Sequence, residues 1–424
     1  MKYLRHIFTF ILTVLALSSC KLTCDCGNVV FPESYDKVMI LYSAGANSLS
    51  SDLTEDINDL CSGYIPGVCS GDALVIISHH NVYKGVSEPV IENVYTDLKG
   101  MVVRDTIKVL EQGSMLTDKE VMRSALTTVD QIFKASRYGM VFSSHATGWL
   151  PTGFYDNPNL WKSGSGSYLP RPDGAVPYKE PILADGEPRV KSIGQTVSGA
   201  LAYEMELVDF AEALPFHFDY ILFDACLMGG IETAYELRDH CDMIGFSQAE
   251  ILAEGLDYKT MGERLLKGKD PDVIGVCQDY FDYYNAQSGS MRSATISLID
   301  CKKLEPLAGI CKKLFNDYRA DISTLSRYRV QRYYRSNRKW FFDLQDMLEK
   351  CSITADESKS LQDALDGCVV YKAATPSFML EYSGFEIDVH CGLSMYLPSE
   401  GNMRLDNAYR KLEWNKATEL VEYD

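Results

Sequence analysis

Apolar segments of strand length alternate with segments of helical spacing through the first two thirds of the chain. Five runs have the length and the β-branched content of strands, at 37–42, 73–78, 139–144, 219–223 and 243–246. Helical patterns lie between or after these runs, at 52–60, 117–135, 199–214 and 229–240. Buried runs separated by helices are typical of a mostly parallel sheet that is covered on both faces. The pattern therefore predicts an α/β/α sandwich.

Two local signals mark the ends of elements. Lys99-Gly100 interrupts an alternating stretch at 94–110, which is typical of a β-hairpin. Thr117-Asp-Lys-Glu120 has the spacing of a capping box and predicts the start of the helix at 117–135.

Two regions depart from this alternation. From 148 to 194 the chain is rich in Gly, Pro and Ser and has no periodicity, and a loop of this length is usually functional or a processing segment. After about residue 290 the pattern changes to mixed helices with strands at 293–299 and 393–397. We therefore expect a core at 37–289 and a C-terminal subdomain at 290–424 packed on it.

The N-terminus has the features of a bacterial lipoprotein signal. Lys2 and Arg5 precede an apolar stretch at 7–17, and Leu17-Ser-Ser-Cys20 resembles a lipobox. We expect removal of 1–19, acylation of Cys20, a tether at 20–36, and an extracytoplasmic, membrane-anchored protein of the bacterial cell envelope. The alternative is an ordinary secretory signal followed by a chance cysteine. Beyond this segment no apolar run is long enough to span a membrane.

Composition and charge narrow the class of partner. Of 424 residues, 46% are hydrophobic and 24% charged, as in ordinary globular proteins. The 41 Lys and Arg residues against 59 Asp and Glu residues give a net charge of −18, which argues against nucleic acid as a partner.

The cysteine spacing predicts no full disulfide framework. The chain has 13 cysteines, a number that in an exported protein would suggest disulfides, but most are scattered without a regular spacing. Cys61 and Cys69 flank a turn-rich loop and could pair or stay free.

Two strand-like runs end next to a reactive side chain. His145 follows the run at 139–144, and Cys226 follows the run at 219–223 at the entry to a helix. Active crevices in open α/β sheets lie at the carboxyl ends of the strands. A thiol at a helix N-terminus gains thiolate character, an imidazole can exchange its proton, and N–H groups of the turn at 226–229 could stabilise an oxyanion. The pair is thus a candidate for Cys/His hydrolysis, and the alternative is a buried cysteine and a core histidine.

Two motifs stand out, Phe223-Asp-Ala-Cys226-Leu-Met-Gly-Gly and Ser144-His145-Ala-Thr-Gly-Trp149. Further short motifs lie at Asn47-Ser-Leu, at Gly245-Phe-Ser-Gln, and at 293–300, 342–344 and 392–398. Together, across most of the mature chain, they resemble the clostripain family of cysteine peptidases, relatives of the caspases and gingipains, and the first two are the most specific. The resemblance implies a caspase-like fold, with Cys226 as the nucleophile, His145 as the general base and acid, and no organic cofactor.

The resemblance also implies a preference for Arg or Lys at the cleaved position, held by acids beneath the S1 pocket. Asp224 matches one of these acids, and Glu254 falls near the other, although the family has Asp there. The family usually has Gly after the histidine, and here Ala146 takes that place. The N–H groups of Ala146 and Cys226 would form the oxyanion hole, provided that Ala146 can adopt the required φ.

The long loop is the expected site of activation cleavage. It lies between His145 and Cys226 and carries the five basic residues Lys162, Arg171, Lys179, Arg189 and Lys191. Lys162 is the first choice because it adjoins the Gly/Ser run at 163–167, and Arg189 and Lys191 follow. The alternative is a lid or substrate-binding loop that stays intact.

These observations favour a lipid-anchored, monomeric cysteine endopeptidase that acts on proteins or peptides with a basic residue at the cleaved position. One alternative is an inactive, caspase-like surface lipoprotein that acts as a binding module, and another is a Cys/His amidase or transpeptidase. No set of side chains has metal-ligand spacing, so no metal site is predicted. Some relatives respond to Ca²⁺, and the acidic composition is compatible with this, but the chain has no loop like that of an EF-hand.

Overall fold

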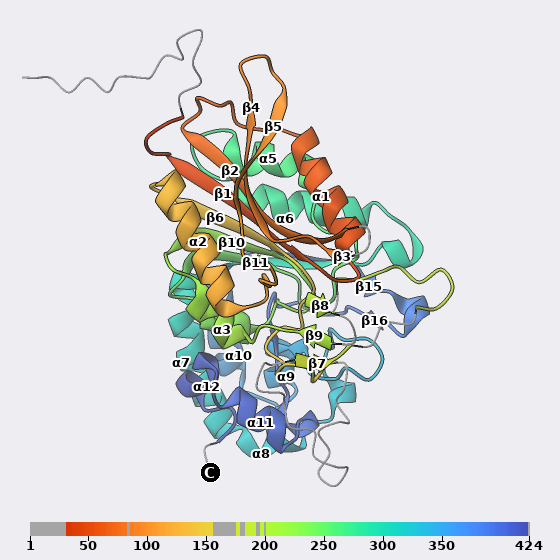
Figure 1. Cartoon of the computed structure of the whole chain (residues 1–424). Helices are drawn as coiled ribbons and strands as arrows, with labels where there is room; N and C mark the ends of the chain where they lie inside the picture. The colour runs from red at the N-terminus through yellow and green to blue at the C-terminus, as the bar shows by residue number, and fades with distance from the viewer. Residues whose placement is uncertain are drawn as a thin grey trace, which may run out of the picture.

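The computed structural model describes residues 31–82, 85–155, 175–178, 183–191, 196–198 and 201–422. The signal segment, Cys20 and Lys162 lie outside these residues. A 10-stranded sheet runs through the molecule in the order β14-β12-β11-β10-β6-β1-β2-β4-β5, with β3 beside β2 (Figure 1).

The centre of the sheet is parallel. It consists of β2 (Asp72–Val82), β1 (Lys37–Gly45), β6 (Tyr138–Ser143), β10 (Phe218–Asp224) and β11 (Cys241–Phe246). All nine residues of β1 are buried, as expected for a strand with both faces covered. The predicted runs are therefore confirmed as the middle of the sheet.

Antiparallel strands extend both edges. On one side lie β4 (Val90–Thr96), β5 (Val102–Val109) and the short β3 (Gly85–Val86). The hairpin between β4 and β5 is as predicted, and Gly100 supplies a φ of +80° at its turn. On the other side lie β12 (Thr295–Asp300) and β14 (Val369–Ala374), so strands after residue 290 continue the sheet of the core.

Helices cover both faces, which confirms the α/β/α sandwich. On one face α5 (Tyr258–Leu266) contacts both α1 (Ser50–Ser62) and α6 (Val273–Asn285). On the other face α3 (Leu207–Ala213) contacts both α2 (Lys119–Phe133) and α4 (Ile231–Glu236). Figure 1 shows α1 and α2 on different sides of the strands. In the part of the chain that is described, no helix is both long and apolar enough to cross a membrane.

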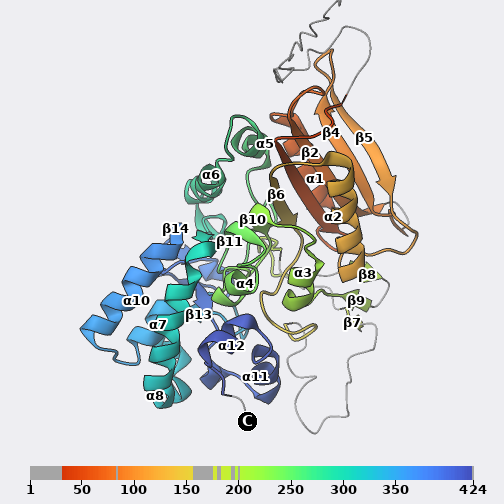
Figure 2. The ribbon, with the colours of Figure 1, turned by 90° about the vertical axis from the view of Figure 1, so that its left-hand side faces the viewer.

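The remaining elements surround the end of the molecule farthest from β4 and β5 (Figure 2). The helices there are α7 (Leu304–Asp317), α8 (Arg319–Thr324), α9 (Leu344–Glu349), α10 (Ala355–Cys368), α11 (Met403–Tyr409) and α12 (Glu413–Thr418). Short two-stranded sheets pair β13 (Phe342–Asp343) with β17 (Ser394–Met395), and β15 (Ser377–Phe378) with β16 (Phe385–Glu386). Single 3₁₀ turns lie at Gly289–Met291, Cys301–Lys303, Arg327–Arg329, Leu380–Tyr382 and Pro398–Glu400.

Two predictions of local structure were wrong. The segment 199–214 is not one helix: α3 begins only at Leu207, and β9 (Leu201–Tyr203) pairs with β7 (Ala175–Pro177) and β8 (Thr196–Ser198). In short apolar segments, periodicity alone does not distinguish a helix from a strand. Here residues 201–203 form a strand because their backbone pairs with β7 and β8. Helix α2 is capped by Asp118, whose side chain accepts from Glu120 N and Val121 N, whereas Thr117 bonds to Thr196 Oγ1.

Cys61 and Cys69 do not pair with each other. Cys61, in the last turn of α1, is a free thiol, while Cys69 is disulfide-bonded. The other described cysteines are free and buried, in keeping with small core residues.

A buried carboxylate joins the core to the C-terminal region. The side chain of Glu232 in α4 is fully buried, and its Oε1 accepts hydrogen bonds from Tyr396 N at 2.8 Å and from Tyr409 Oη at 2.9 Å. Burial raises the pKa of Glu232 from 4.5 to about 7, which the two hydrogen bonds only partly counteract. The folded state therefore holds a proton at pH values where the unfolded chain has already lost it.

Glu232→Gln should change the pH dependence of stability. Because the pKa of Glu232 is higher in the folded than in the unfolded state, the wild-type protein loses stability as the pH rises from about 4.5 to about 7. The variant lacks this titration, so its free energy of unfolding relative to wild type should rise by about 3 kcal/mol between pH 4.5 and pH 8. Urea unfolding at several pH values measures this difference. The exposed control Glu55→Gln should show no such trend, and a parallel pair of profiles for Glu232→Gln and wild type would contradict the assignment.

Candidate active site

The loops after β6 and β10 leave the sheet side by side. Ser143 and Asp224, the last residues of these strands, are register partners, and Ser144 N donates to Asp224 O at 3.4 Å. His145 and Cys226 each follow two residues later. At Gly148, which has a φ of +62°, an added Cβ would lie 2.6 Å from the Leu227 carbonyl oxygen. Glycine is thus required in the histidine motif because the two loops touch there.

Cys226 is buried where these two loops meet. Its side chain is fully buried, and Ile251 N donates to its Sγ at 3.0 Å. Burial raises the pKa of the thiol well above its usual value, and the nearby carboxylate of Glu250 raises it further. The thiol is consequently neutral in this arrangement.

The turn after Cys226 does not supply the expected run of free N–H groups. Leu227 N donates to Ala249 O at 2.9 Å and Gly229 N to Ser247 O at 2.7 Å, so these two groups are engaged by the loop after β11. Leu227 takes a φ of +62°, a strained value for a non-glycine residue that the two bonds enforce. Among the described residues, no acceptor is bonded to the N–H of Cys226.

His145 is oriented by a residue that sequence analysis did not assign. Its Nε2 lies 3.1 Å from Ser48 Oγ, and its buried Nδ1 has no hydrogen-bond partner among the described residues. Burial lowers the pKa of His145 to about 3, so the imidazole is neutral. Ser48 is presented by an Asn47 turn, in which Leu49 N donates to Asn47 Oδ1 at 2.9 Å. In the sequence, Ser48 lies within the Asn47-Ser-Leu match, three residues after the end of β1, but it was given no role there.

The end of the long loop lies in extended form against the loop after β11. Lys191 N donates to Ile251 O at 2.8 Å, Ala253 N donates to Arg189 O at 2.9 Å, and Val190 and Leu252 form an antiparallel bridge. The carbonyl oxygen of Lys191 accepts from Ala146 N at 3.3 Å. Ala146 does this without a positive φ, so the replacement of the family's glycine leaves the donor intact.

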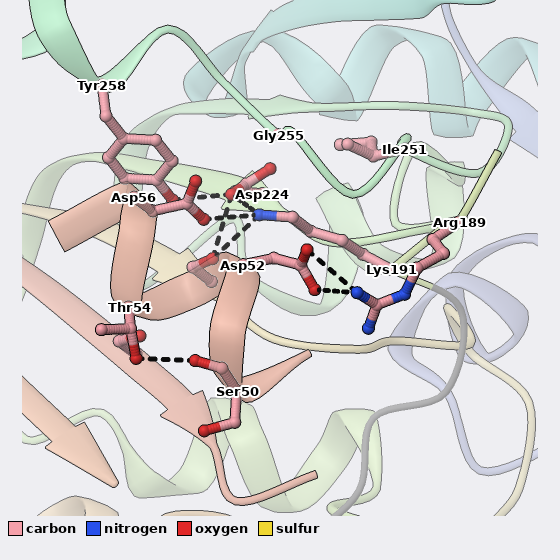
Figure 3. A network of polar contacts seen from close by, with 12 residues as sticks. Ser50, Asp52, Thr54, Asp56, Arg189, Lys191, Asp224, Ile251, Gly255 and Tyr258 are labelled. Atoms are coloured by element: carbon pink, nitrogen blue, oxygen red, sulfur yellow. Dashed lines mark hydrogen bonds and ion pairs between the residues drawn. The ribbon is translucent and has the colours of Figure 1, made fainter. Parts of the chain in front are cut away.

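The side chain of Lys191 fills a buried acidic pocket (Figure 3). Its ammonium is hydrogen-bonded to Asp224, lies 2.9 Å from Asp56 Oδ2, and is 3.4 Å from Ser143 Oγ. Tyr258 Oη donates to Asp224 Oδ2 at 2.6 Å. Burial disfavours the ammonium, but Asp224 and Asp56 outweigh it and raise the pKa of Lys191, so the side chain is charged.

One of the two predicted pocket acids lies elsewhere. Asp224 lines the pocket, but the side chain of Glu254 is exposed, so the prediction of Glu254 was wrong. The chain turns at Gly255, which has a φ of +67°, and Gly255 rather than Glu254 borders the ammonium: an added Cβ would lie 2.5 Å from Lys191 Nζ. Asp56, on α1, takes the second acidic position. Its signal in the sequence is weak, a second acid one helical turn after Asp52.

The sequence of the chain settles its family. A sequence model of the clostripain family matches residues 182–422, which is more than half of the chain. The chain belongs to the clostripain family. It is therefore a cysteine peptidase by family, as the motifs around His145 and Cys226 indicated. No curated protein matches the chain.

Solved structures of clostripain-family proteases share its fold. An inactive zymogen C11 protease from Parabacteroides distasonis is 24% identical, with a TM-score of 0.72 over 92% of this chain and 99% of that one. A secreted C11 cysteine protease from Bacteroides thetaiotaomicron, in complex with an irreversible peptide inhibitor, is 24% identical, with a TM-score of 0.71 over 91% of this chain and 100% of that one.

Ser48→Ala should impair turnover through the orientation of His145. Without the Ser48 hydroxyl, Nε2 of the buried imidazole loses its only described partner, and a misoriented base lowers kcat more than it raises KM. We expect kcat for a peptide substrate to fall about tenfold, a typical cost of a hydrogen bond to a catalytic group. Steady-state kinetics measure the change, with the exposed Ser62→Ala at the far end of α1 as a control. Equal kcat values for Ser48→Ala and wild type would exclude this role.

Proposed function

We propose that this chain is an endopeptidase that cleaves after Lys or Arg, with Cys226 as the nucleophile and His145 as the proton carrier. One observation supports this most strongly. Lys191 has its ammonium between Asp56 and Asp224 and its carbonyl oxygen at Ala146 N, which is how the residue before a scissile bond has to be bound. A carboxylate pair in a buried pocket favours a cationic side chain over a neutral one.

In the proposed reaction, His145 and Cys226 act in sequence. His145 Nδ1 accepts the thiol proton, and Sγ of Cys226 attacks the carbonyl carbon. The developing oxyanion accepts hydrogen bonds from Ala146 N–H and from the otherwise unbonded N–H of Cys226. The imidazolium then protonates the leaving amine, and a thioester remains on Cys226. A water molecule that gives its proton to His145 hydrolyses the thioester and restores the thiol.

We further propose that the chain is made as a self-blocked precursor and is activated by cleavage after Lys191. A substrate cannot enter the pocket while Lys191 fills it, so the segment has to leave before other peptides are cut. Arg189 is disfavoured because its carbonyl is bonded to Ala253 N and not to an oxyanion donor. Lys162, the first choice from sequence, lies outside the described residues and has no comparable support. The lipid anchor at Cys20 stays a prediction from the sequence.

The acidic pocket is tested by a ratio that does not depend on how much enzyme is active. For wild type, kcat/KM should be far higher for a peptide ending in Lys than for the same peptide ending in norleucine. Asp224→Asn and Asp56→Asn should each lower this ratio at least about tenfold, because a buried cation loses a charged partner. Competition between the two peptides in one reaction gives the ratio directly.

Two controls make the outcome decisive. Glu254→Gln, which changes an exposed acid of the same loop, should leave the ratio within about twofold, as expected for a surface charge. Cys226→Ala should abolish cleavage of both peptides, since removal of a covalent nucleophile costs several orders of magnitude. Similar turnover of both peptides by the wild-type enzyme would contradict the proposed specificity.

A further inference from the structure

We infer that the peptidase has two additional charged subsites, formed by Asp52 and by Arg335. They select a basic side chain at P3, two residues before the cleaved residue, and an acidic side chain at P5, four residues before it. The inference rests on the proposed function, because it counts positions from Lys191 as P1. Its basis is that residues 187–191 contain three charged side chains, Glu187, Arg189 and Lys191, and the core meets each with the opposite charge.

The P3 subsite is a consequence of strand geometry. In an extended segment alternate side chains point to the same side, so Arg189 lies on the same side as Lys191. Both meet α1, where Asp52 and Asp56 are four residues apart and therefore on one helix face. The Arg189 guanidinium lies 2.9 Å from Asp52 Oδ2 (Figure 3). It also donates to Ser48 O. The side chain of Arg189 is 42% exposed, so water screens this ion pair and we expect the selectivity of the subsite to be modest.

The P5 subsite is less exposed to solvent than the P3 subsite. The side chains of Glu187 and Arg335 are only 13% and 12% exposed, and Arg335 Nη1 donates to Glu187 Oε1 at 2.6 Å. The same carboxylate accepts from Ala184 N at 2.9 Å, which closes the turn where the segment enters. A charge-assisted bond in a partly desolvated place discriminates more strongly than one at the surface.

Arg335 is held by the core and not by the segment alone. Its Nε donates to Glu250, a buried carboxylate that also accepts from Tyr155 Oη at 3.2 Å. Glu250 directly precedes Ile251, whose N–H contacts Cys226 and whose carbonyl binds Lys191 N. When the segment leaves, Glu250 therefore still fixes Arg335 beside the backbone that pairs with substrate. Nη1 also donates to Tyr382 O at 3.4 Å, and its second hydrogen is then available for a new carboxylate. A site preorganised in this way favours peptides of the pattern acidic-x-basic-x-Lys.

The test changes the substrate first, so that folding of variants is not at issue. Processed wild-type enzyme is given Glu-Pro-Arg-Val-Lys, the sequence of 187–191, with a fluorogenic group after Lys, and the same peptide with Gln or Lys at P5 and with Gln or Glu at P3. We expect kcat/KM to fall about tenfold for Lys at P5 and about threefold for Glu at P3, as for partly buried and exposed ion pairs.

Enzyme variants then assign each preference to a residue. Asp52→Lys should reverse the P3 preference so that Glu exceeds Arg, while Asp59→Asn on the same helix should keep it. Arg335→Gln should remove the P5 preference, and the exposed Arg329→Gln should keep it. If Arg335→Gln fails to fold, the peptides that differ at P5 still show, with the wild-type enzyme, whether an acidic residue is preferred there.

The outcomes separate this inference from the proposed function. Equal cleavage of all peptides that end in Lys, with none of a peptide that ends in norleucine, would overturn the subsites and leave the basic P1 specificity standing. No cleavage of any peptide that ends in Lys would overturn both. A P3 or P5 preference that persists in Asp52→Lys or in a folded Arg335→Gln would overturn the assignment to these residues.

Discussion

The ion pair of Lys191 with Asp56 and Asp224 is the interaction on which the arrangement of the site depends. All three side chains are almost fully removed from water, and taking such charges out of water is costly unless they are paired. Burial and the neighbouring Asp224 raise the pKa of Asp56, and the ammonium of Lys191 opposes this shift. Without a cation, two carboxylates in this space would repel each other, and one would take up a proton. The pocket therefore favours a bound cation over a neutral group, first from the chain itself and then, in the proposed function, from a substrate.

The surroundings of His145 and Cys226 keep both side chains neutral. With Lys191 in place, His145 and Cys226 are buried, and burial favours the neutral form of each: it raises the pKa of the thiol and lowers that of the imidazole to about 3. Departure of the segment would let water and substrate into this space and reduce both shifts. In the proposed function, occupation of the pocket would thus block substrate binding and suppress formation of the thiolate at the same time.

Sequence patterns predicted the elements better than the contacts between them. The continuous apolar runs correctly predicted the parallel strands at the centre of the sheet. Strands that are buried on both faces are apolar along most of their length, so they are easily recognised in the sequence. The strand ends then placed His145 and Cys226 in adjacent loops. Asp56, Ser48 and Arg335 were not assigned, since each reaches the site from an element distant in sequence. The prediction that Glu254 lines the pocket was wrong because the positive φ of Gly255 turns the chain there and determines which residue faces the pocket. The strand at 201–203 was predicted as helix because one of its pairing partners, β7, is distant in sequence.

The position of cleavage tests the central claim most directly, namely that Lys191 is a substrate bound in its own active site. Wild type, Cys226→Ala and Lys191→Ala are incubated separately, and new N-termini are mapped by mass spectrometry over time. The account predicts a new N-terminus at Ser192 in wild type and no cleavage in Cys226→Ala. It also predicts that Lys191→Ala remains uncut there. A wild-type chain that becomes fully active while the bond between Lys191 and Ser192 stays intact would contradict it.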